Sequence, residues 1–446
     1  MSRQLALNAF IYPAGHHEAA WRHPLSQPER IYDADYYQQI ARTAEAAKFD
    51  AVFFADAPAL AENVEFNAAG RLDPVVLLAT IAAATSRIGL IATASTTYSE
   101  PYNLARSFAA LDHVSGGRAG WNIVTTAAEN ASANFGFAEH PRADDRYARA
   151  AEFVDAATAL WDSWDDDAVV LDKAAGRYVD TARIHTVDAD GDHVRVAGPL
   201  NAPRPPQGHP VLVQAGASNA GRDFAGRYAE AIFTAHQTLH DAQRFYDDIR
   251  SRARAHGRDP RWVKVLPGIS PFIADTEAKA KELEREFDEL TVPAYGLSQL
   301  SRLVGEDLTG LRLDGPVPRE LFADAGDVGN NLRSRKQVVA GIVEREQPTV
   351  RRLLHRLAGA RGHRVVAGTP EQVADTIEEW FTSGAADGFN VMPPYYPGGL
   401  EVFAATVVPI LQRRGLFRTE YSGTTLREHL GLPRPASRHA ATSLAG

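Results

Sequence analysis

Short apolar segments alternate with amphipathic segments along most of this chain, and this alternation constrains the fold more than any other feature. Eight segments have the apolar, β-branched character of buried strands, at 5–12, 50–55, 87–96, 119–125, 211–216, 231–235, 264–274 and 388–394. Segments with helical spacing separate most of them, as at Tyr36, Ile40 and Ala44. Strands separated by helices pair in parallel, so the pattern predicts an α/β fold, a (β/α)₈ TIM barrel.

The spacing of these segments also predicts the domain organisation. Residues 1–432 are expected to form a single barrel domain, with an excursion at 165–209 and an insertion of helix and loop at 275–365. Within the excursion, Asp190-Gly191 predicts a hairpin turn. The polar tail 433–446 is expected to be disordered. A doubly wound sheet is disfavoured because no G-x-G-x-x-G follows the first strand and no phosphate-loop motif occurs.

Composition excludes several classes of function. No apolar run approaches the ~20 residues of a membrane span. A formal charge of -9 without a basic run argues against nucleic acid. With Cys 0 the chain has no disulfide, thiolate metal site or cysteine nucleophile. The amino terminus lacks a signal-peptide pattern, so we expect a cytoplasmic protein acting on a small molecule.

Polar residues collect where the predicted strands end, which is where a barrel carries its active site. The stretch SGGRAGWNIVTT places hydroxyls at the end of one strand, and QAGAS precedes a helix whose positive end suits a phosphate. The candidates are Asp56, Thr93, Asn122, Thr125, Thr126, Gly216 and Ser218. Hydroxyls, an amide and one carboxylate suit cofactor binding better than hydrolysis. Ser218 could equally be an ordinary helix cap, and Asp56 could cap the following segment.

Two further groups of side chains have alternative interpretations. Tyr147 lies on the apolar face of a helix, where it either packs in the core or reaches the barrel mouth. His16, His17 and His23 cluster after the first strand, in GHHEAAWRH. Their spacing does not fit a metal site, and no metal is expected; a base or a substrate contact is the better use of one of them.

Several long motifs, in order, resemble those of one family. They are LDHVSGGRAGWNIVTT, NFG, RY, LWDSWDDDAVVLDK and GPLNAPRPPQGHPVLVQAGASNAGRDFA. They closely resemble the flavin-dependent monooxygenases of the bacterial luciferase superfamily, and most nearly the nitrilotriacetate, EDTA and dibenzothiophene-sulfone monooxygenase branch. The likeness extends from about residue 5 to LREHLGL, near Leu432.

The resemblance implies a luciferase-like barrel that uses reduced FMN (FMNH₂) delivered by a separate NAD(P)H-dependent flavin reductase. With O₂ as co-substrate, a C4a-peroxyflavin would insert one oxygen atom into a small organic substrate and cleave a C–N or C–S bond, as in xenobiotic degradation. A homodimer or homotetramer is implied. Two other functions stay open, a deazaflavin-dependent oxidoreductase and a catalytically silent flavin-binding protein. A carboxylated amine, a thioether conjugate, a sulfone and an aromatic heterocycle are all compatible substrates.

The resemblance also implies roles for individual residues. Asp56, Thr125 or Thr126, Tyr147 and Ser218 match flavin-binding positions, Ser218 through the phosphate, and Thr93 falls where relatives often place a cis peptide beside the flavin ring. The chain departs from the pattern at two places where many relatives carry histidine. These places are Ala143, with His140 and Arg142 nearby, and Ala127. His16 and His17 therefore become the candidates for catalytic acid–base work.

Overall fold

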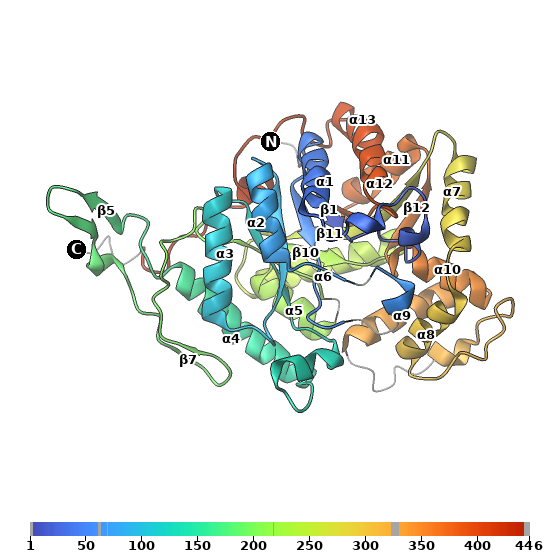
Figure 1. Cartoon of the computed structure of the whole chain (residues 1–446), viewed down its shortest axis with the longest axis horizontal. Coiled ribbons are helices and arrows are strands. Elements are labelled where there is room, and N and C mark those ends of the chain that lie inside the picture. The colour runs from blue at the N-terminus through green and yellow to red at the C-terminus, as the bar shows by residue number, and fades with distance from the viewer. Residues whose placement is uncertain (1–2, 61–63, 69, 217, 323–329, 441–446) are drawn as a thin grey trace.

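A closed barrel of parallel strands forms the centre of the molecule (Figure 1). The computed structural model describes residues 3–60, 64–68, 70–216, 218–322 and 330–440. In this part of the chain, strands pair in the order β10-β9-β4-β3-β2-β1-β13-β11, and an additional β10–β11 pairing closes the ring. The barrel strands are β1 (Ala6–Ile11), β2 (Ala51–Phe54), β3 (Gly89–Ser95), β4 (Ala119–Val124), β9 (Val211–Gln214), β10 (Ala231–Thr234), β11 (Lys264–Ile273) and β13 (Gly388–Val391). The predicted (β/α)₈ barrel is confirmed.

Helices cover the outside of the barrel, and several begin at a side-chain cap. Asp73 accepts a hydrogen bond from the backbone of Val76, and Thr369 forms a capping box with Gln372. None of the helices in the described part of the chain is long and apolar enough to cross a membrane. The outer helices are α1 (Ala34–Ala46), α2 (Pro74–Ala84), α3 (Pro101–Ser115), α4 (Ala143–Trp161), α5 (Asn219–Tyr228), α6 (Leu239–Ala255), α11 (Pro370–Thr382), α12 (Gly398–Val402) and α13 (Val408–Arg413), the last two joined by the π-helical turn Phe403–Val407.

Alternation along each strand divides the core into two shells. Outward residues such as Leu7 and Trp121 belong to the large apolar cluster between barrel and helices. Inward residues such as Phe10 and Phe53 belong to a smaller cluster inside the barrel. Leu426, in the short helix α14 (Leu426–His429), joins the inner cluster. A Cβ on Gly89 of β3 would overlap its side chain, so α14 fills the amino-terminal end of the barrel. The carboxyl ends of the strands are left to form the site.

The excursion at 165–209 forms two hairpins, and one projects far from the barrel (Figure 1). The predicted hairpin at Asp190-Gly191 is confirmed as β7 (Ala189–Asp190) paired with β8 (Arg195–Val196). The projecting hairpin, β5 (Val169–Asp172) with β6 (Arg177–Val179), has no counterpart among the sequence-based predictions.

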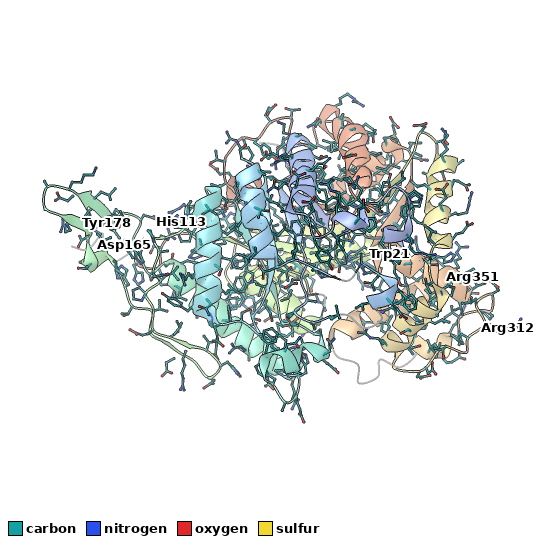
Figure 2. The ribbon with its side chains drawn as sticks, viewed as in Figure 1. Trp21, His113, Asp165, Tyr178, Arg312 and Arg351 are labelled. Carbon is teal, nitrogen blue, oxygen red and sulfur yellow. The ribbon has the colours of Figure 1, made fainter. Side chains whose placement is uncertain are left out.

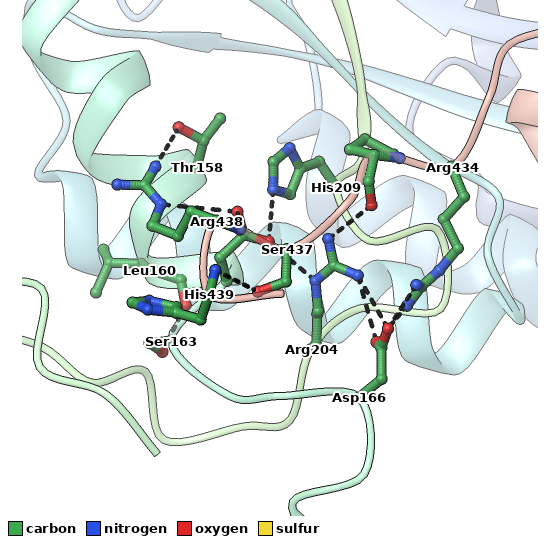
Figure 3. A network of polar contacts seen from close by, with 12 residues as sticks. Thr158, Leu160, Ser163, Asp166, Arg204, His209, Arg434, Ser437, Arg438 and His439 are labelled. Atoms are coloured by element: carbon green, nitrogen blue, oxygen red, sulfur yellow. Dashed lines mark hydrogen bonds and ion pairs between the residues drawn. The ribbon is translucent and has the colours of Figure 1, made fainter. Parts of the chain in front are cut away.

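A buried ionic network fastens the end of the excursion to α4 and to the chain terminus (Figure 3). Arg204 Nε donates to Asp162 Oδ1 at 2.9 Å, and His209 Nε2 lies 2.9 Å from the same oxygen. Arg434 bonds Asp166, and Arg438 lies beside Asp162. The tail was expected to be disordered from residue 433, but residues 433–440 make these specific contacts because polar composition suits an ionic interface as well as disorder. Residues 441–446 lie outside the described residues.

The insertion at 275–365 is mostly helical and packs to one side of the barrel mouth (Figure 1). It contains α7 (Glu277–Glu289), α8 (Pro293–Val304), α9 (Asn330–Glu346) and α10 (Val350–Ala360). Its leucine and valine side chains form a separate apolar cluster. The sequence analysis found no strand here, but β12 (Arg364–Gly368) pairs with the last five residues of β11. The apolar part of β12 is too short to be recognised without its partner.

Candidate functional site

Aromatic side chains line the barrel interior just below the mouth. Phe10 stacks on Phe53 with ring centroids 4.5 Å apart, and Phe233 meets Phe10 edge-on at 5.0 Å. Three buried polar atoms, in β4, at the end of β9 and after β1, have no hydrogen-bond partner within the described structure, namely Asn122 Oδ1, Gln214 Oε1 and His16 Nδ1. Because unpaired buried polar atoms cost free energy, such a group of atoms marks a place where a polar ligand would bind.

Thr93 and Asn122 lie side by side in the β3–β4 register and are both buried. Asn122 Nδ2 donates to Thr93 Oγ1 at 2.8 Å, and Thr93 Oγ1 donates to the carbonyl of Phe54 at 2.8 Å. This chain of bonds fixes the Asn122 amide and leaves its oxygen free. The resemblance implied a cis peptide at Thr93, and this expectation is wrong. Among the described residues the cis bonds are Gly198-Pro199 and Tyr396-Pro397.

The two threonines after β4 are held by different hydrogen bonds, Thr126 through its side-chain hydroxyl and Thr125 through its backbone carbonyl. Thr126 is buried, has φ +34 and donates through Oγ1 to Ser95 Oγ at 2.7 Å. The Thr125 carbonyl instead accepts from Thr97 Oγ1 at 2.9 Å. Hydroxyl groups of β3 and β4 therefore meet at one corner of the mouth. The positive φ of Thr126 turns the chain sharply there, which a β-branched residue seldom tolerates outside special sites.

Ser218 caps α5, and Tyr147 of α4 reaches the same point. Ser218 Oγ accepts from the backbone N–H of Gly221 at 3.0 Å. A Cβ on Gly221 would lie 2.8 Å from the Tyr147 hydroxyl and 3.1 Å from Ser218 Oγ, so both hydroxyls border the first turn of the helix. Gly216 leaves room for the amide of Gln214. Two hydroxyls and a helix N-terminus form a cradle whose chemistry fits a phosphate group.

Asp56 follows β2 and is half-buried. Burial raises the pKa of its carboxyl, while a backbone hydrogen bond and the nearby Arg71 act in the opposite direction. Arg71 links this end of β2 to the end of β1, because it contacts the Ala55 carbonyl at 3.5 Å and donates to the Tyr12 hydroxyl at 2.8 Å. The structure thus brings Asp56 into the neighbourhood of the residues that follow β1.

The two candidate histidines occupy different surroundings. His16 is fully buried and donates through Nε2 to the Phe10 carbonyl at 2.7 Å, which leaves Nδ1 as a lone-pair acceptor. Burial, with the charge of Arg361, holds the pKa of His16 well below its usual 6.5. His17 accepts a backbone hydrogen bond through Nδ1 and lies 3.4 Å from Asp288 of α7. Burial also lowers the pKa of His17, against the influence of Asp288. Both rings are neutral at pH 7.

A cavity of about 150 Å³ opens beside these histidines, between β1 and the insertion. Arg361, at the end of α10, lies over the Tyr12 ring at 4.2 Å. Burial raises the pKa of Glu18 to about 7 although Arg361 opposes the shift. His363 stacks on Phe233 at 4.7 Å. The sequence analysis missed Arg71, Arg361 and His363, because no strand end or motif singles out these residues and only folding of the insertion brings the last two to the mouth.

Ala143 stands where many relatives of the resembling family carry a histidine, and the nearby His140 does not replace that group. Ala143 is the first residue of α4. The nearby His140 accepts from Arg146 at 2.6 Å through Nε2 and contacts the Tyr98 hydroxyl at 2.8 Å through Nδ1. Both ring nitrogens are thus engaged within the protein. His140 holds the loop after β4 in place rather than offering a free base.

A barrel that gathers hydroxyls, amides and a helix N-terminus in this way is typical of cofactor-dependent enzymes. The family described as luciferase-like monooxygenase matches residues 12–387. N-acetyl-S-(2-succino)cysteine monooxygenase of Bacillus subtilis (strain 168) is 46% identical, covering 98% of this chain and 99% of the relative. Nitrilotriacetate monooxygenase component A of Aminobacter aminovorans is 46% identical, with 99% of each chain covered.

Structural comparison gives the same result. EDTA monooxygenase from Chelativorans sp. BNC1 superimposes with a TM-score of 0.82 at 36% identity, covering 97% of this chain and 99% of the other. The chain therefore belongs to the luciferase-like monooxygenase family and is a flavin-dependent monooxygenase. These matches confirm the resemblance to the nitrilotriacetate and EDTA branch.

Proposed function

We propose that this protein is the oxygenase component of a two-component system, in which a separate NAD(P)H-dependent reductase delivers FMNH₂ and one atom of O₂ enters a small organic substrate. The observation that carries this proposal is the cradle at the start of α5, formed by Ser218 and Tyr147, together with the unpaired polar atoms at the ends of the barrel strands. Both features match FMN, whose phosphate is anionic and whose ring edge is polar.

In this proposal, one group of residues binds the phosphate of FMN and another group contacts its ring. Ser218, Tyr147 and the first backbone N–H groups of α5 would hold the phosphate, with Gly216 allowing close approach of the backbone. Thr93, Asn122, Thr125, Thr126 and Asp56 would border the ring. Reduced FMN, when bound, supplies the electrons that activate O₂ for transfer of one oxygen atom.

The chain's own contribution is to exclude water and to place a proton acceptor. Phe10, Phe53 and Phe233 make the interior side of the site apolar, which protects reactive species from water. His16 is neutral and fixed, with Nδ1 free to accept a proton. His17, which borders the cavity, is the second candidate for proton transfer. The expected outcome is cleavage of a C–N or C–S bond, because two of the relatives are named for an amine and a thioether, nitrilotriacetate and N-acetyl-S-(2-succino)cysteine.

Anaerobic titration with FMNH₂, followed by rapid mixing with oxygenated buffer, tests the proposal. A near-ultraviolet flavin absorbance that outlives the corresponding signal in free solution, together with O₂ consumption, is the expected result. Tight FMNH₂ binding with no reaction with O₂ would favour a silent flavin-binding protein. Reduction of a deazaflavin without O₂ consumption would favour the deazaflavin-dependent oxidoreductase. Failure to bind FMNH₂ would refute the proposed cofactor.

A further inference from the structure

Two arginines make cation–π contacts with the same aromatic ring at the wall of the cavity beside β1. Arg71 lies over the Tyr12 ring at 4.5 Å, and Arg361 lies over the same ring at 4.2 Å. Arg71 comes from the segment before α2, whereas Arg361 ends α10 in the left-handed conformation, with φ +51. Elements almost 300 residues apart in the chain therefore bring two positive charges to one place.

Neither charge forms a direct ion pair within the described part of the chain, although Glu18 lies within electrostatic reach of Arg361 and Asp56 within that of Arg71. Among the residues that the structure describes, no carboxylate lies within ion-pair distance of either guanidinium, although 56 acidic residues occur in the sequence. Within the described residues, the Arg361 guanidinium makes no hydrogen bond, and that of Arg71 bonds only the Tyr12 hydroxyl and the Ala55 carbonyl. Two like charges in a half-buried position repel each other more strongly than in water. An anion bound near both guanidiniums would offset that repulsion.

The rest of the cavity wall offers one free hydrogen-bond donor. Asn67 donates to the Tyr295 hydroxyl at 2.8 Å, so the Tyr295 O–H proton is free to be donated into the cavity. The Trp21 N–H is already used by the Phe66 carbonyl at 2.9 Å. Glu18 is the one acidic side chain on this wall. The volume of about 150 Å³ is below the ~300 Å³ at which drug-sized pockets begin, so the ligand is small.

We infer that the substrate is a small carboxylic acid, whose carboxylate binds between Arg71 and Arg361 while the rest of the molecule extends toward His16 and the barrel mouth. This inference deepens the proposed monooxygenase function and rests on it for the reaction. It narrows the four substrate classes that the sequence left open to those that carry a carboxylate. Arginine recognises carboxylates through paired N–H donors, so the two residues would set both affinity and orientation.

Calorimetric titration of the whole chain tests the inference, with iminodiacetate, nitrilotriacetate and succinate as probes, each paired with its uncharged amide. At least one acid should bind, and its amide should bind at least tenfold more weakly. Arg71→Gln and Arg361→Gln should each weaken binding of the acid about tenfold or more, and Arg361→Lys should restore part of it. Arg312→Gln is the matched control, since Arg312 is exposed at the outer edge of the insertion, away from Trp21 (Figure 2). Absence of binding by all three acids would overturn the inference.

The pH dependence of binding supplies a readout that a purely structural role of the arginines would not produce. Glu18, with a pKa of about 7, becomes charged as pH rises from 6 to 8 and then competes for Arg361. Affinity for the acid should therefore fall across this range in the wild type and stay flat in Glu18→Gln. The described titratable and charged groups that border the cavities shared by Glu18 are Tyr12, His17, Arg71, Tyr295, Arg302, Arg351, His355 and Arg361. His355→Gln should keep the wild-type slope; loss of the slope in His355→Gln alone would refute the role of Glu18.

Failure of the proposed flavin cofactor can be distinguished from failure of the proposed carboxylate site. FMNH₂ affinity is measured on the same variants, and Arg361→Gln should leave it unchanged. Binding of an acid without FMNH₂ binding would overturn the proposed cofactor and keep the carboxylate site. Binding of FMNH₂ with equal affinity for acid and amide would keep the monooxygenase proposal and overturn the carboxylate site.

Discussion

Replacing Ser218 with alanine separates a phosphate ligand from an ordinary helix cap. Ser218 Oγ accepts the Gly221 N–H at 3.0 Å, so its loss removes the cap of α5 and costs about 0.5–2 kcal/mol of unfolding free energy in any case. If the hydroxyl also donates to the flavin phosphate, we expect an additional loss of about 1–2 kcal/mol in FMNH₂ binding. That loss corresponds to a roughly five- to thirtyfold higher Kd.

The matched control is a second helix cap. Thr276 caps α7 through the Lys279 N–H at 3.3 Å and is not among the proposed flavin-binding residues. Thr276→Ala should lower stability by a similar amount while leaving the Kd for FMNH₂ unchanged. Gly221→Ala should weaken FMNH₂ binding more than Ser218→Ala, because the added Cβ would crowd both the Tyr147 and Ser218 hydroxyls.

Two assays give the decisive comparison. Urea unfolding without flavin measures the cap, and anaerobic FMNH₂ titration measures the ligand contact. An unchanged Kd in Ser218→Ala, with stability lowered as in Thr276→Ala, would show that Ser218 is only a cap and would refute its assignment to the phosphate.

Three further predictions follow from buried polar groups. Asp162→Asn should lower the free energy of unfolding in urea by about 1–3 kcal/mol, because the buried Arg204 Nε loses its carboxylate partner while Arg204 Nη1 keeps Asp166; an unchanged urea midpoint would contradict this. Thr93→Val should cost about 1–3 kcal/mol by leaving the Asn122 amide and the Phe54 carbonyl unpaired, whereas an unchanged urea midpoint would show that these groups find other partners. Stability should fall as pH drops from 7 to 5, since unfolded histidines take up protons below about 6.5 while buried His16 and His17 do not. His16→Gln should reduce this fall by up to about 1.4 kcal/mol per pH unit, and an identical pH profile would contradict the burial argument.

Local sequence determined the barrel and one half of the candidate site. Strands and helices are specified by periodicities of two and 3.6 residues, and caps such as Asp73 and Thr369 by nearest-neighbour chemistry, so these features can be predicted from short windows. The carboxyl ends of parallel strands must meet, so residues such as Thr93, Asn122 and Ser218 could be assigned to one face of the barrel before any coordinates. Their binding of FMN stays a prediction, as do the oligomeric state and the cytoplasmic location.

The other half of the candidate site, around the cavity beside β1, was determined by tertiary structure alone. Arg361 and His363 reach the mouth because α10 packs against α7 and α8 within the insertion and β12 joins β11, and neither event leaves a periodic signal in the sequence. The neutral state of His16 follows from burial, and the pKa of Glu18 follows from burial opposed by a charge more than 300 residues away. Electrostatics depends on distances through space rather than along the chain. The chemistry of the substrate pocket therefore became readable only after the chain was folded.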